Sequence, residues 1–434
     1  MLPGQLVEIK TKSGIFNGTV LTVLPDSISL KLLSGYNIVL KKNDFESFKV
    51  IEEKKPSKSN GNHKLEFKSG LPVISILMMG GTIASRVDYE TGAVKTYFEP
   101  QDLVLMFPEL SKLANFKTRV IGKILSEDIR FDHYVKMGLE IKKEIEAGGI
   151  KGIIIPHGTD TMHYSSAALA FIFENLFVPI ILVGAQRSSD RGSSDAAQNL
   201  LAAVQFITKS DFKGIGICMH ENSSDETCII LPATKTRKMH TSRRDAFRPI
   251  NSNPIARVFP YQEKIELLSG YSNEPVAGKL VVKPKFEEKV GIIKARPNMH
   301  WQEFDFFRKN KYKGLVIEGT GLGGAPVGVP DEISKPNKKI FDAIKKLVKS
   351  GCVVVMSSQC IYGGVKMNVY QGGVFLSETG VISCSDMTTE TAYVKLSWLL
   401  GNFSVQKARE LMAENLRGEI NARIQMDFFP PRLD

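Results

Sequence analysis

Residues 73–82 read VISILMMGGT, an almost unbroken apolar run that ends in two glycines and a threonine. A strand that is apolar on both faces is typical of a parallel sheet covered by helices on both sides. Similar runs recur at 152–155, 178–183 and 214–219. Helical periodicity lies between these runs, at 131–147, 161–175 and 194–207. Strands that alternate with helices predict an α/β fold with a mainly parallel, doubly wound sheet.

Five segments are expected along the chain. Residues 1–53 alternate in the strand manner between tight turns and predict a small β-barrel of the SH3 or Sm-like kind. A polar linker follows at 54–71. The larger α/β domain with the active site is expected at 72–265, an inter-domain connection at 266–290, and a smaller C-terminal α/β domain at 291–434.

Composition narrows the class of protein. The chain has 434 residues, of which 43% are hydrophobic and 24% charged, the mix of a globular protein with several domains. No apolar run approaches the ~18 residues of a membrane helix, and no signal peptide is recognisable, so we expect no membrane partner and a cytoplasmic location. The formal net charge of +11 permits a polyanionic partner such as RNA without identifying one. The five cysteines form no C-x-x-C pair, which argues against a disulfide framework or a zinc site.

Nucleotide-binding motifs are absent or incomplete. No G-x-x-x-x-G-K-[ST] sequence is present, so no P-loop for ATP is expected. Residues 319–324 match G-x-G-x-x-G after a predicted strand. Pro326 and Pro330 follow, however, and they forbid the helix that a dinucleotide site requires.

Hydroxyl and carboxylate side chains follow two of the predicted strands where each strand ends. Thr82 comes directly after the first strand, and the HGTD sequence at 157–160 follows the second and opens a helix. Open α/β sheets bind their ligands at the carboxyl ends of strands, where a helix N-terminus also favours negative charge. The alternatives are a simple turn at Thr82 and an N-cap role for Thr159 or Asp160. Two hydroxyl-bearing loops on neighbouring strands favour a catalytic site.

Two further stretches carry candidate residues. Ser126 and Glu127 lie between the two loops and can bind the polar ends of a small amino acid, with helix capping as the alternative. Residues 233–248 hold six cations against one acid, which is most simply a solvated face. A buried lysine in this stretch could instead lose its proton and act as a base.

The motifs together resemble the L-asparaginase family over roughly residues 72–430, in order and spacing. The stretches that carry the resemblance are 79–84, 126–128, 157–162, 184–187 and 234–235. The resemblance implies an amidohydrolase in which Thr82 is the acylated nucleophile. It further implies that Thr159, Asp160 and Lys235 form a hydrogen-bonded relay, and that Ser126 and Glu127 bind the substrate.

Residues 235–249 and the N-terminal β-domain are more narrowly similar to one branch of that family, the glutaminase subunits of archaeal tRNA-dependent amidotransferases. This implies that glutamine is hydrolysed to glutamate, and that the ammonia passes to a tRNA-binding partner, the E-type subunit of that system. The partner would use ATP and Mg²⁺ to convert Glu-tRNA(Gln) to Gln-tRNA(Gln). The chain itself would bind no cofactor or metal. It would form a homodimer core within an α2β2 complex, and charged tRNA(Gln) would be contacted mainly through the partner.

Some assignments stay open. The family places a tyrosine soon after the first threonine, and Tyr89, on a possible lid at 86–92, is only a weak candidate for it. Glu390 either caps a helix or points across a subunit interface. A free L-asparaginase is the alternative function. A non-catalytic RNA-binding or scaffold protein is a third, although such a protein would usually have lost at least one of Thr82, Thr159, Asp160 and Lys235.

Overall fold

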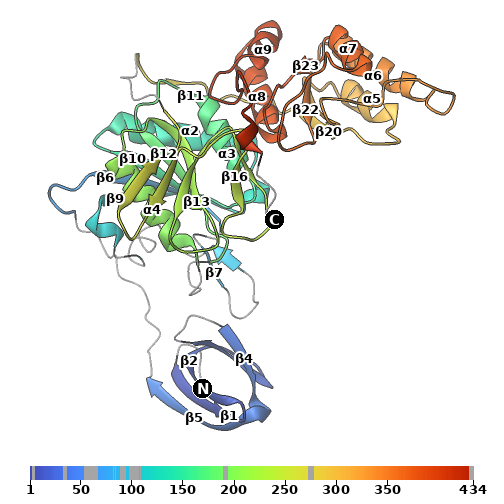
Figure 1. Cartoon of the computed structure of the whole chain (residues 1–434). Coiled ribbons are helices and arrows are strands. Elements are labelled where there is room, and N and C mark those ends of the chain that lie inside the picture. The colour runs from blue at the N-terminus through green and yellow to red at the C-terminus, as the bar shows by residue number, and fades with distance from the viewer. Residues whose placement is uncertain are drawn as a thin grey trace.

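The computed structural model of the chain is shown in Figure 1. It describes residues 1, 5–32, 37–52, 67–81, 83, 85–87, 94–96, 107, 109–188, 194–271 and 278–429. Three bodies follow one another in Figure 1: an N-terminal sheet, a large α/β unit and a C-terminal α/β unit. None of the helices in the described part of the chain is long and apolar enough to cross a membrane.

The N-terminal body is an antiparallel sheet of five strands in the order β4-β3-β2-β1-β5. The strands are β1 (Leu6–Thr11), β2 (Gly14–Val23), β3 (Ser27–Leu32), β4 (Asn37–Lys41) and β5 (Phe45–Glu52), with the 3-10 helix η1 (Lys42–Asp44) before β5. Residues on one face form a small core, namely Val7, Ile9, Val20, Ile28 and Leu30. The short antiparallel strands expected here are confirmed, while their likeness to an SH3 or Sm barrel stays a prediction.

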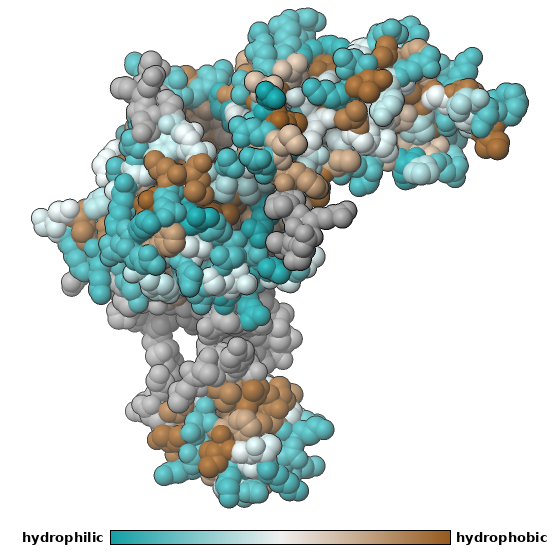
Figure 2. Space-filling view, in the orientation of Figure 1, coloured by the Kyte–Doolittle hydropathy of each residue, from teal (hydrophilic) through white to brown (hydrophobic). Residues whose placement is uncertain are grey.

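Apolar side chains also lie on the surface of this N-terminal sheet. Ile15, Val39 and Phe48 are each more than half exposed. Figure 2 shows hydrophobic surface gathered on the same body, whereas the visible face of the large unit is mostly hydrophilic. A hydrophobic surface area of this kind is typical of an interaction surface.

The large unit is built on a sheet of eight strands in the order β18-β17-β14-β13-β12-β10-β6-β9. The strands are β6 (Val73–Gly80), β9 (Asn115–Ile124), β10 (Gly152–Pro156), β12 (Pro179–Val183), β13 (Gly214–His220), β14 (Cys228–Pro232), β17 (Ala256–Phe259) and β18 (Lys264–Leu267). The neighbours from β9 to β13 pair in parallel, and those from β13 to β18 pair antiparallel. The mainly parallel sheet predicted from the apolar runs is therefore confirmed, with an antiparallel extension at one edge.

Helices cover both faces of this sheet. Helices α2 (Phe131–Ala147) and α3 (Met162–Ile172) share a core with Leu77 and Met79 of β6. Helix α4 (Ala196–Lys209) packs in a second core with Ile74 and Ile76 of the same strand. Successive side chains of a strand point to opposite faces, which is why this strand reads as a continuous apolar run.

The C-terminal unit has a four-stranded parallel sheet in the order β20-β21-β22-β23. Its elements are β20 (Val290–Lys294), α5 (Trp301–Lys309), β21 (Gly314–Gly319), α6 (Asn337–Lys349), β22 (Val353–Ser358), α7 (Gln371–Glu378), β23 (Ile382–Ser383), α8 (Thr389–Asn402) and α9 (Val405–Met412). In the fully described stretch 320–330, no helix follows β21 directly, as the prolines there predicted. Helix α8 packs against both α3 and β21, so the two α/β units share one hydrophobic core.

Short elements complete the described chain. Three two-stranded ribbons pair β7 (Ser85–Val87) with β8 (Val94–Thr96), β11 (Phe173–Glu174) with β19 (Val281–Val282), and β15 (Thr236–Lys238) with β16 (Phe247–Pro249). The remaining 3-10 helices are η3 (Leu110–Lys112), η4 (Ser126–Asp128) and η5 (Met426–Phe428). The domain boundaries expected from the sequence stay predictions.

Candidate active site

Four loops meet at the carboxyl ends of β6, β9, β10 and β12. A Cβ built on Gly81 would lie 2.3 Å from the backbone nitrogen of Gly158, and one built on Gly158 would lie 2.8 Å from Cβ of Ser126. A Cβ on Gly184 would lie 2.7 Å from Cγ2 of Thr159. Glycine therefore allows these backbones to approach more closely than any other residue would. The sequence predicted that the two threonine-bearing loops come together. The structure shows this contact for Gly81, the residue before Thr82.

Gly81 provides a direct test of this close approach. Its φ of +83° is one that residues with a Cβ rarely adopt, and the added methyl would collide with backbone atoms. Gly81→Ala should therefore lower both the amidase activity and the free energy of unfolding, the latter by ~1–3 kcal/mol or more. Gly148→Ala is the matched control, because Gly148 has a φ of +70° but nothing within 4 Å of its added Cβ. Equal activity in the two variants, measured alongside urea unfolding, would contradict the close loop contact.

Thr159, Asp160 and Lys238 form a hydrogen-bonded cluster at this edge of the sheet. Nζ of Lys238 donates to Oγ1 of Thr159 at 2.8 Å and to Oδ1 of Asp160 at 2.6 Å. Thr159 is buried, whereas the side chain of Asp160 is 63% exposed, so the cluster opens to solvent on the side of the carboxylate. Because Oγ1 of Thr159 accepts from an ammonium group, its own hydrogen is free to be donated elsewhere.

Ser126 links its loop to that cluster. Its Oγ accepts from the backbone N–H of Asp160 at 3.2 Å, and its carbonyl oxygen accepts from Oγ1 of Thr161 at 2.6 Å. Ser126 is buried, while Glu127 beside it is exposed. Both residues therefore lie on a loop that contacts the Thr159 loop, as expected for substrate contacts, although their binding roles stay predictions.

The expected hydrogen bonds of Lys235 to this cluster are not found, and this part of the prediction is wrong. Nζ of Lys235 instead pairs with the carboxylate of Asp386 and donates to its carbonyl oxygen at 3.1 Å. Lys235 and Asp386 are both about 1% exposed. Burial lowers the pKa of the Lys235 ammonium, and the Asp386 carboxylate opposes that shift. Lys238 occupies the place in the relay that was expected for Lys235.

Strand geometry explains the three-residue error. Lys235 stands immediately before β15, and Lys238 is its last residue. Side chains alternate along a strand, so residues separated by an odd number of positions point to opposite faces. Lys235 and Arg237 both reach residues at the start of α8, whereas Lys238 reaches the cluster. This alternation gives no usable signal in the sequence, because β15 is only three residues long.

The cations of the basic stretch around β15 form ion pairs within the chain, in which Asp245 serves two arginines. Each of its six cations has an acidic partner, in the pairs Lys235–Asp386, Arg237–Glu390, Lys238–Asp160, Arg243–Asp245, Arg244–Asp225 and Arg248–Asp245. A polyanion binds through cations whose charge is available to it. The stretch is therefore better described as a network of internal ion pairs than as a solvated basic face.

Two buried histidines lie beside the cluster. Burial lowers the pKa of His157 to about 4, although a bond between its Nδ1 and the Gly158 carbonyl opposes the shift. Burial, aided by the charges of Arg237 and Lys238, lowers the pKa of His163 to about 3. Both rings are therefore neutral at pH 7 and must gain a proton when the chain unfolds in mild acid.

These histidines predict an acid-sensitive fold. Because each folded-state pKa lies below the ordinary value of 6.5, the unfolded chain binds more protons, and stability falls as the pH drops from 6.5 towards 4. At pH 5 each histidine should lower the free energy of unfolding by roughly 2 kcal/mol. His220, whose pKa is raised, acts in the opposite direction. Urea unfolding at pH 7, 6 and 5 checks this, and a His163→Gln variant that keeps the full wild-type slope would contradict it.

The remaining predicted positions divide between described and undescribed residues. Thr82 and Tyr89 lie outside the described residues. Thr388 is the N-cap of α8, since its Oγ1 accepts from the N–H of Thr391 at 3.2 Å. The capping pattern is thus confirmed through Thr388, while Glu390 instead pairs with Arg237 at 3.2 Å. Among the described residues, no cluster of His, Cys, Asp or Glu has the geometry of a metal site.

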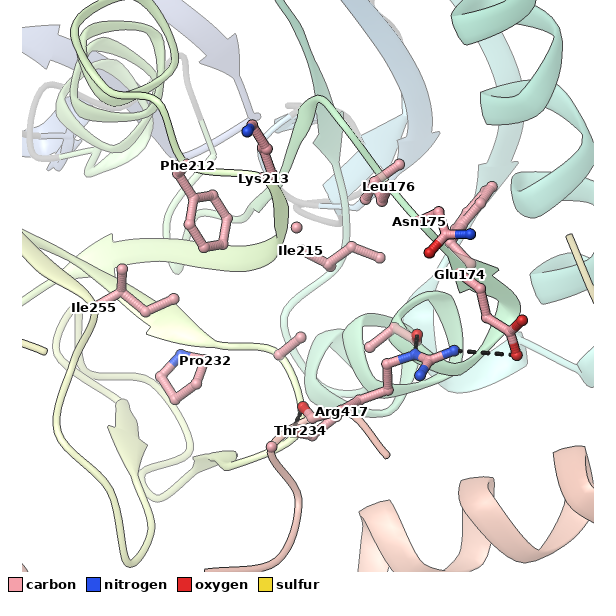
Figure 3. A pocket seen from close by; sticks show the side chains of 15 residues that line it. Glu174, Asn175, Leu176, Phe212, Lys213, Ile215, Pro232, Thr234, Ile255 and Arg417 are labelled. Carbon is pink, nitrogen blue, oxygen red and sulfur yellow. Dashed lines mark hydrogen bonds and ion pairs between the residues drawn. The ribbon is translucent and has the colours of Figure 1, made fainter. Parts of the chain in front are cut away.

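A separate cleft of about 600 Å³ lies where β13 begins and β14 ends. This is the end of the large sheet opposite to the one that carries Thr159 and Asp160. Figure 3 shows Arg417 pointing towards Glu174 across this cleft, with Thr234 beside it. The Nη2–Oε1 distance of that pair is 3.5 Å. None of Thr159, Asp160 and Lys238 lines the cleft, so it is distinct from the candidate active site.

Comparison with known proteins agrees with this geometry. The family model "Asparaginase, N-terminal" matches residues 73–271, and "Glutaminase/Asparaginase C-terminal domain" matches residues 289–412. The D-type subunit of glutamyl-tRNA(Gln) amidotransferase from Methanococcus maripaludis is 42% identical over 98% of this chain and 99% of its own length. The chain belongs to the asparaginase family, among the D-type subunits of glutamyl-tRNA(Gln) amidotransferases. The corresponding protein from Pyrococcus furiosus is 44% identical over 91% of this chain and 87% of its own.

Solved structures of the asparaginase family separate the shared part of the chain from the rest. The thermostable L-asparaginase from Thermococcus kodakarensis matches with a TM-score of 0.71 and 28% identity, over 81% of this chain and 100% of its own. The probable cytoplasmic L-asparaginase from Campylobacter jejuni gives 0.64 and 25%, over 79% and 100%. The L-asparaginases thus leave part of this chain without a counterpart, whereas the Methanococcus maripaludis protein covers nearly all of it. The part of the chain beyond the L-asparaginase match is therefore shared with the D-type relative.

Proposed function

We propose that the chain is the glutaminase subunit of a tRNA-dependent amidotransferase, which releases ammonia from glutamine for the amidation of Glu-tRNA(Gln). The observation that carries this proposal is the bonding of Lys238 to both Thr159 and Asp160. The loop that bears Thr159 and Asp160 contacts Gly81, the residue before Thr82. The names of the relatives supply the tRNA-dependent context.

The proposed reaction proceeds through a threonine acyl-enzyme. Oγ1 of Thr82 attacks the side-chain amide carbon of glutamine and gives up its hydroxyl proton. The C–N bond then breaks, and the nitrogen leaves as ammonia after taking up one proton, so that the proton lost by Thr82 is balanced. Water then hydrolyses the ester to glutamate and restores the hydroxyl. Thr159 directs its hydroxyl hydrogen to the reacting atoms, while Lys238 and Asp160 hold Thr159 in place. Backbone N–H groups of the two loops stabilise the tetrahedral oxyanion.

Substrate recognition is assigned to the loop at 126–127. Glu127 is exposed beside the cluster and supplies a carboxylate for the substrate ammonium, while Ser126 serves the carboxylate end. From the sequence alone, the segment 86–92 with Tyr89 is proposed to couple hydrolysis to charged tRNA. Equal glutaminase rates of the full complex with and without Glu-tRNA(Gln) would reject that coupling.

The partner side of the proposal concerns the complex. A homodimer of this chain would carry two copies of a tRNA-binding subunit in an α2β2 complex in the cytoplasm. The partner would hold ATP and Mg²⁺, and it would make most of the contacts to charged tRNA(Gln). We assign the N-terminal sheet, as an SH3 or Sm-like barrel, to docking, and its exposed Ile15, Val39 and Phe48 support that role.

A covalent-trapping experiment tests the proposed nucleophile. The natively purified complex is treated with a diazoketone analogue of glutamine, and the labelled peptide is identified by mass spectrometry. We expect the label on Thr82, no label in a Thr82→Ala variant, and protection by excess glutamine. Labelling of Thr159 instead would overturn the choice of nucleophile, and absence of ammonia release from glutamine would overturn the function.

The alternative of a free L-asparaginase is favoured by one observation, the match of complete L-asparaginase structures to about four-fifths of this chain. A free asparaginase would prefer asparagine and would keep its rate after removal of residues 1–60. An amidotransferase component should instead co-purify with a stoichiometric tRNA-binding polypeptide. Native purification followed by assays on both amides separates the two.

A further inference from the structure

Strand β15 carries Lys238 on one face and contacts the C-terminal unit through its other face. We call residues 386–391, which lead into and begin helix α8, the α8 entry segment. Three residues of this segment bond to the stretch that leads into and forms β15. Oγ1 of Thr391 donates to the carbonyl oxygen of Thr234 at 2.8 Å, Asp386 pairs with Lys235, and Glu390 pairs with Arg237.

The last of these contacts is immediately next to the catalytic cluster. Arg237 and Lys238 are consecutive residues of β15, and their side chains lie on opposite faces of it. One reaches Glu390 with an Nη2–Oε1 distance of 3.2 Å, and the other reaches Thr159 and Asp160. A shift of the strand at Arg237 would therefore displace Lys238 directly.

The carboxylate that pairs with Arg237 is buried at the start of a helix. Glu390 is 6% exposed, and it lies in the first turn of α8, where the helix dipole stabilises a negative charge. Helix α8 in turn packs against α3, the helix that follows the Thr159 loop. Burial and then the charge of Glu390 raise the pKa of Tyr164 on α3.

We propose that Glu390 is a positioning residue for the amidase reaction. Through Arg237 it fixes β15 against the C-terminal unit and thereby sets the place of Lys238 at Thr159. The proposal rests on the glutaminase function proposed above. It implies that the C-terminal unit, although it supplies no residue of the described catalytic cluster, determines the geometry of that cluster.

A double-mutant cycle tests the proposal in the purified complex. Glu390→Gln keeps the shape of the side chain and removes its charge, and it should lower kcat for glutamine about tenfold with little change in KM. Displacement of a catalytic group by about 1 Å can cost up to ~10²-fold. In a Lys238→Met background the same substitution should change the residual rate less than twofold, because the group that it positions is gone.

One control variant and the contradicting outcomes complete the test. Glu303→Gln removes another carboxylate of the C-terminal unit that pairs with an arginine, Arg296 at 2.8 Å, far from β15 in sequence, and it should leave kcat unchanged. A purely structural role for Glu390 would give equal fold losses in both backgrounds, and this result, or no loss in the wild-type background, would overturn the proposal. If wild-type protein lacks glutaminase activity, or Lys238→Met retains it, the proposed function itself has failed.

Discussion

Replacement of Lys238 by methionine should lower kcat for glutamine hydrolysis by about 10³-fold. A positioned acid–base group typically contributes ~10²–10⁴-fold. Thr159 is that group in the proposed reaction, and Lys238 holds both Thr159 and Asp160 in place. The fold should survive, because Asp160 is largely exposed and water can replace the lost ammonium. Steady-state ammonia release measures the rate, and thermal unfolding of the same preparation measures stability.

Lys235→Met is the matched comparison for this loss of rate. The two lysines are three residues apart and receive the same substitution, but only Lys238 contacts the cluster. Lys235→Met protein that is folded should still release ammonia from glutamine through the acyl-enzyme. The reverse outcome, with a silent Lys238 and an essential Lys235, would mean that the relay lysine expected from the family motif is correct and that the cluster seen here is not catalytic.

The strands of the large sheet, and the loops that meet at their carboxyl ends, could be predicted from the sequence. The apolar run at 73–79, followed by glycines, predicts a strand buried on both faces, and the structure places helices on both sides of it. Thr159 and Asp160 lie in the loop between β10 and α3. Because β10 and β6 are parallel neighbours, this loop and the glycine loop after β6 lie at the same end of the sheet and contact each other. These local patterns are sufficient because neighbouring parallel strands end at a common edge.

Residue roles in 235–238 could not be obtained in the same way. Which lysine faces the cluster depends on where β15 begins, and the ribbon is only three residues long, too short for a periodic signal. The partners of Lys235 and Arg237 are about 150 residues away in sequence, at the entry to α8. No motif in the basic stretch indicates that Lys235 and Arg237 pair with acids of the C-terminal unit, since ion pairing of this kind is a property of the tertiary fold.

Lys235→Met should destabilise the protein by roughly 3–5 kcal/mol, the usual cost of leaving one member of a buried ion pair without its partner. Both side chains are about 1% exposed, and the Asp386 carboxylate also accepts from the N–H of Asn421 at 3.0 Å and from its Nδ2 at 2.8 Å. The pair joins the segment before β15 to the α8 entry segment. Its loss should therefore loosen the contact between the two α/β units as well as lower the midpoint of urea unfolding.

The double variant Lys235→Met/Asp386→Leu distinguishes the charge from the packing. A buried pair replaced by apolar residues of similar volume is often neutral or stabilising, so the second substitution should restore much of the lost stability. Some loss should remain, because Asn421 would keep two donors without their carboxylate acceptor. If the double variant is less stable than Lys235→Met by a further ~3 kcal/mol or more, the Asp386 carboxylate stabilises the fold chiefly through Asn421, and the ion pair is not the main connection between the units.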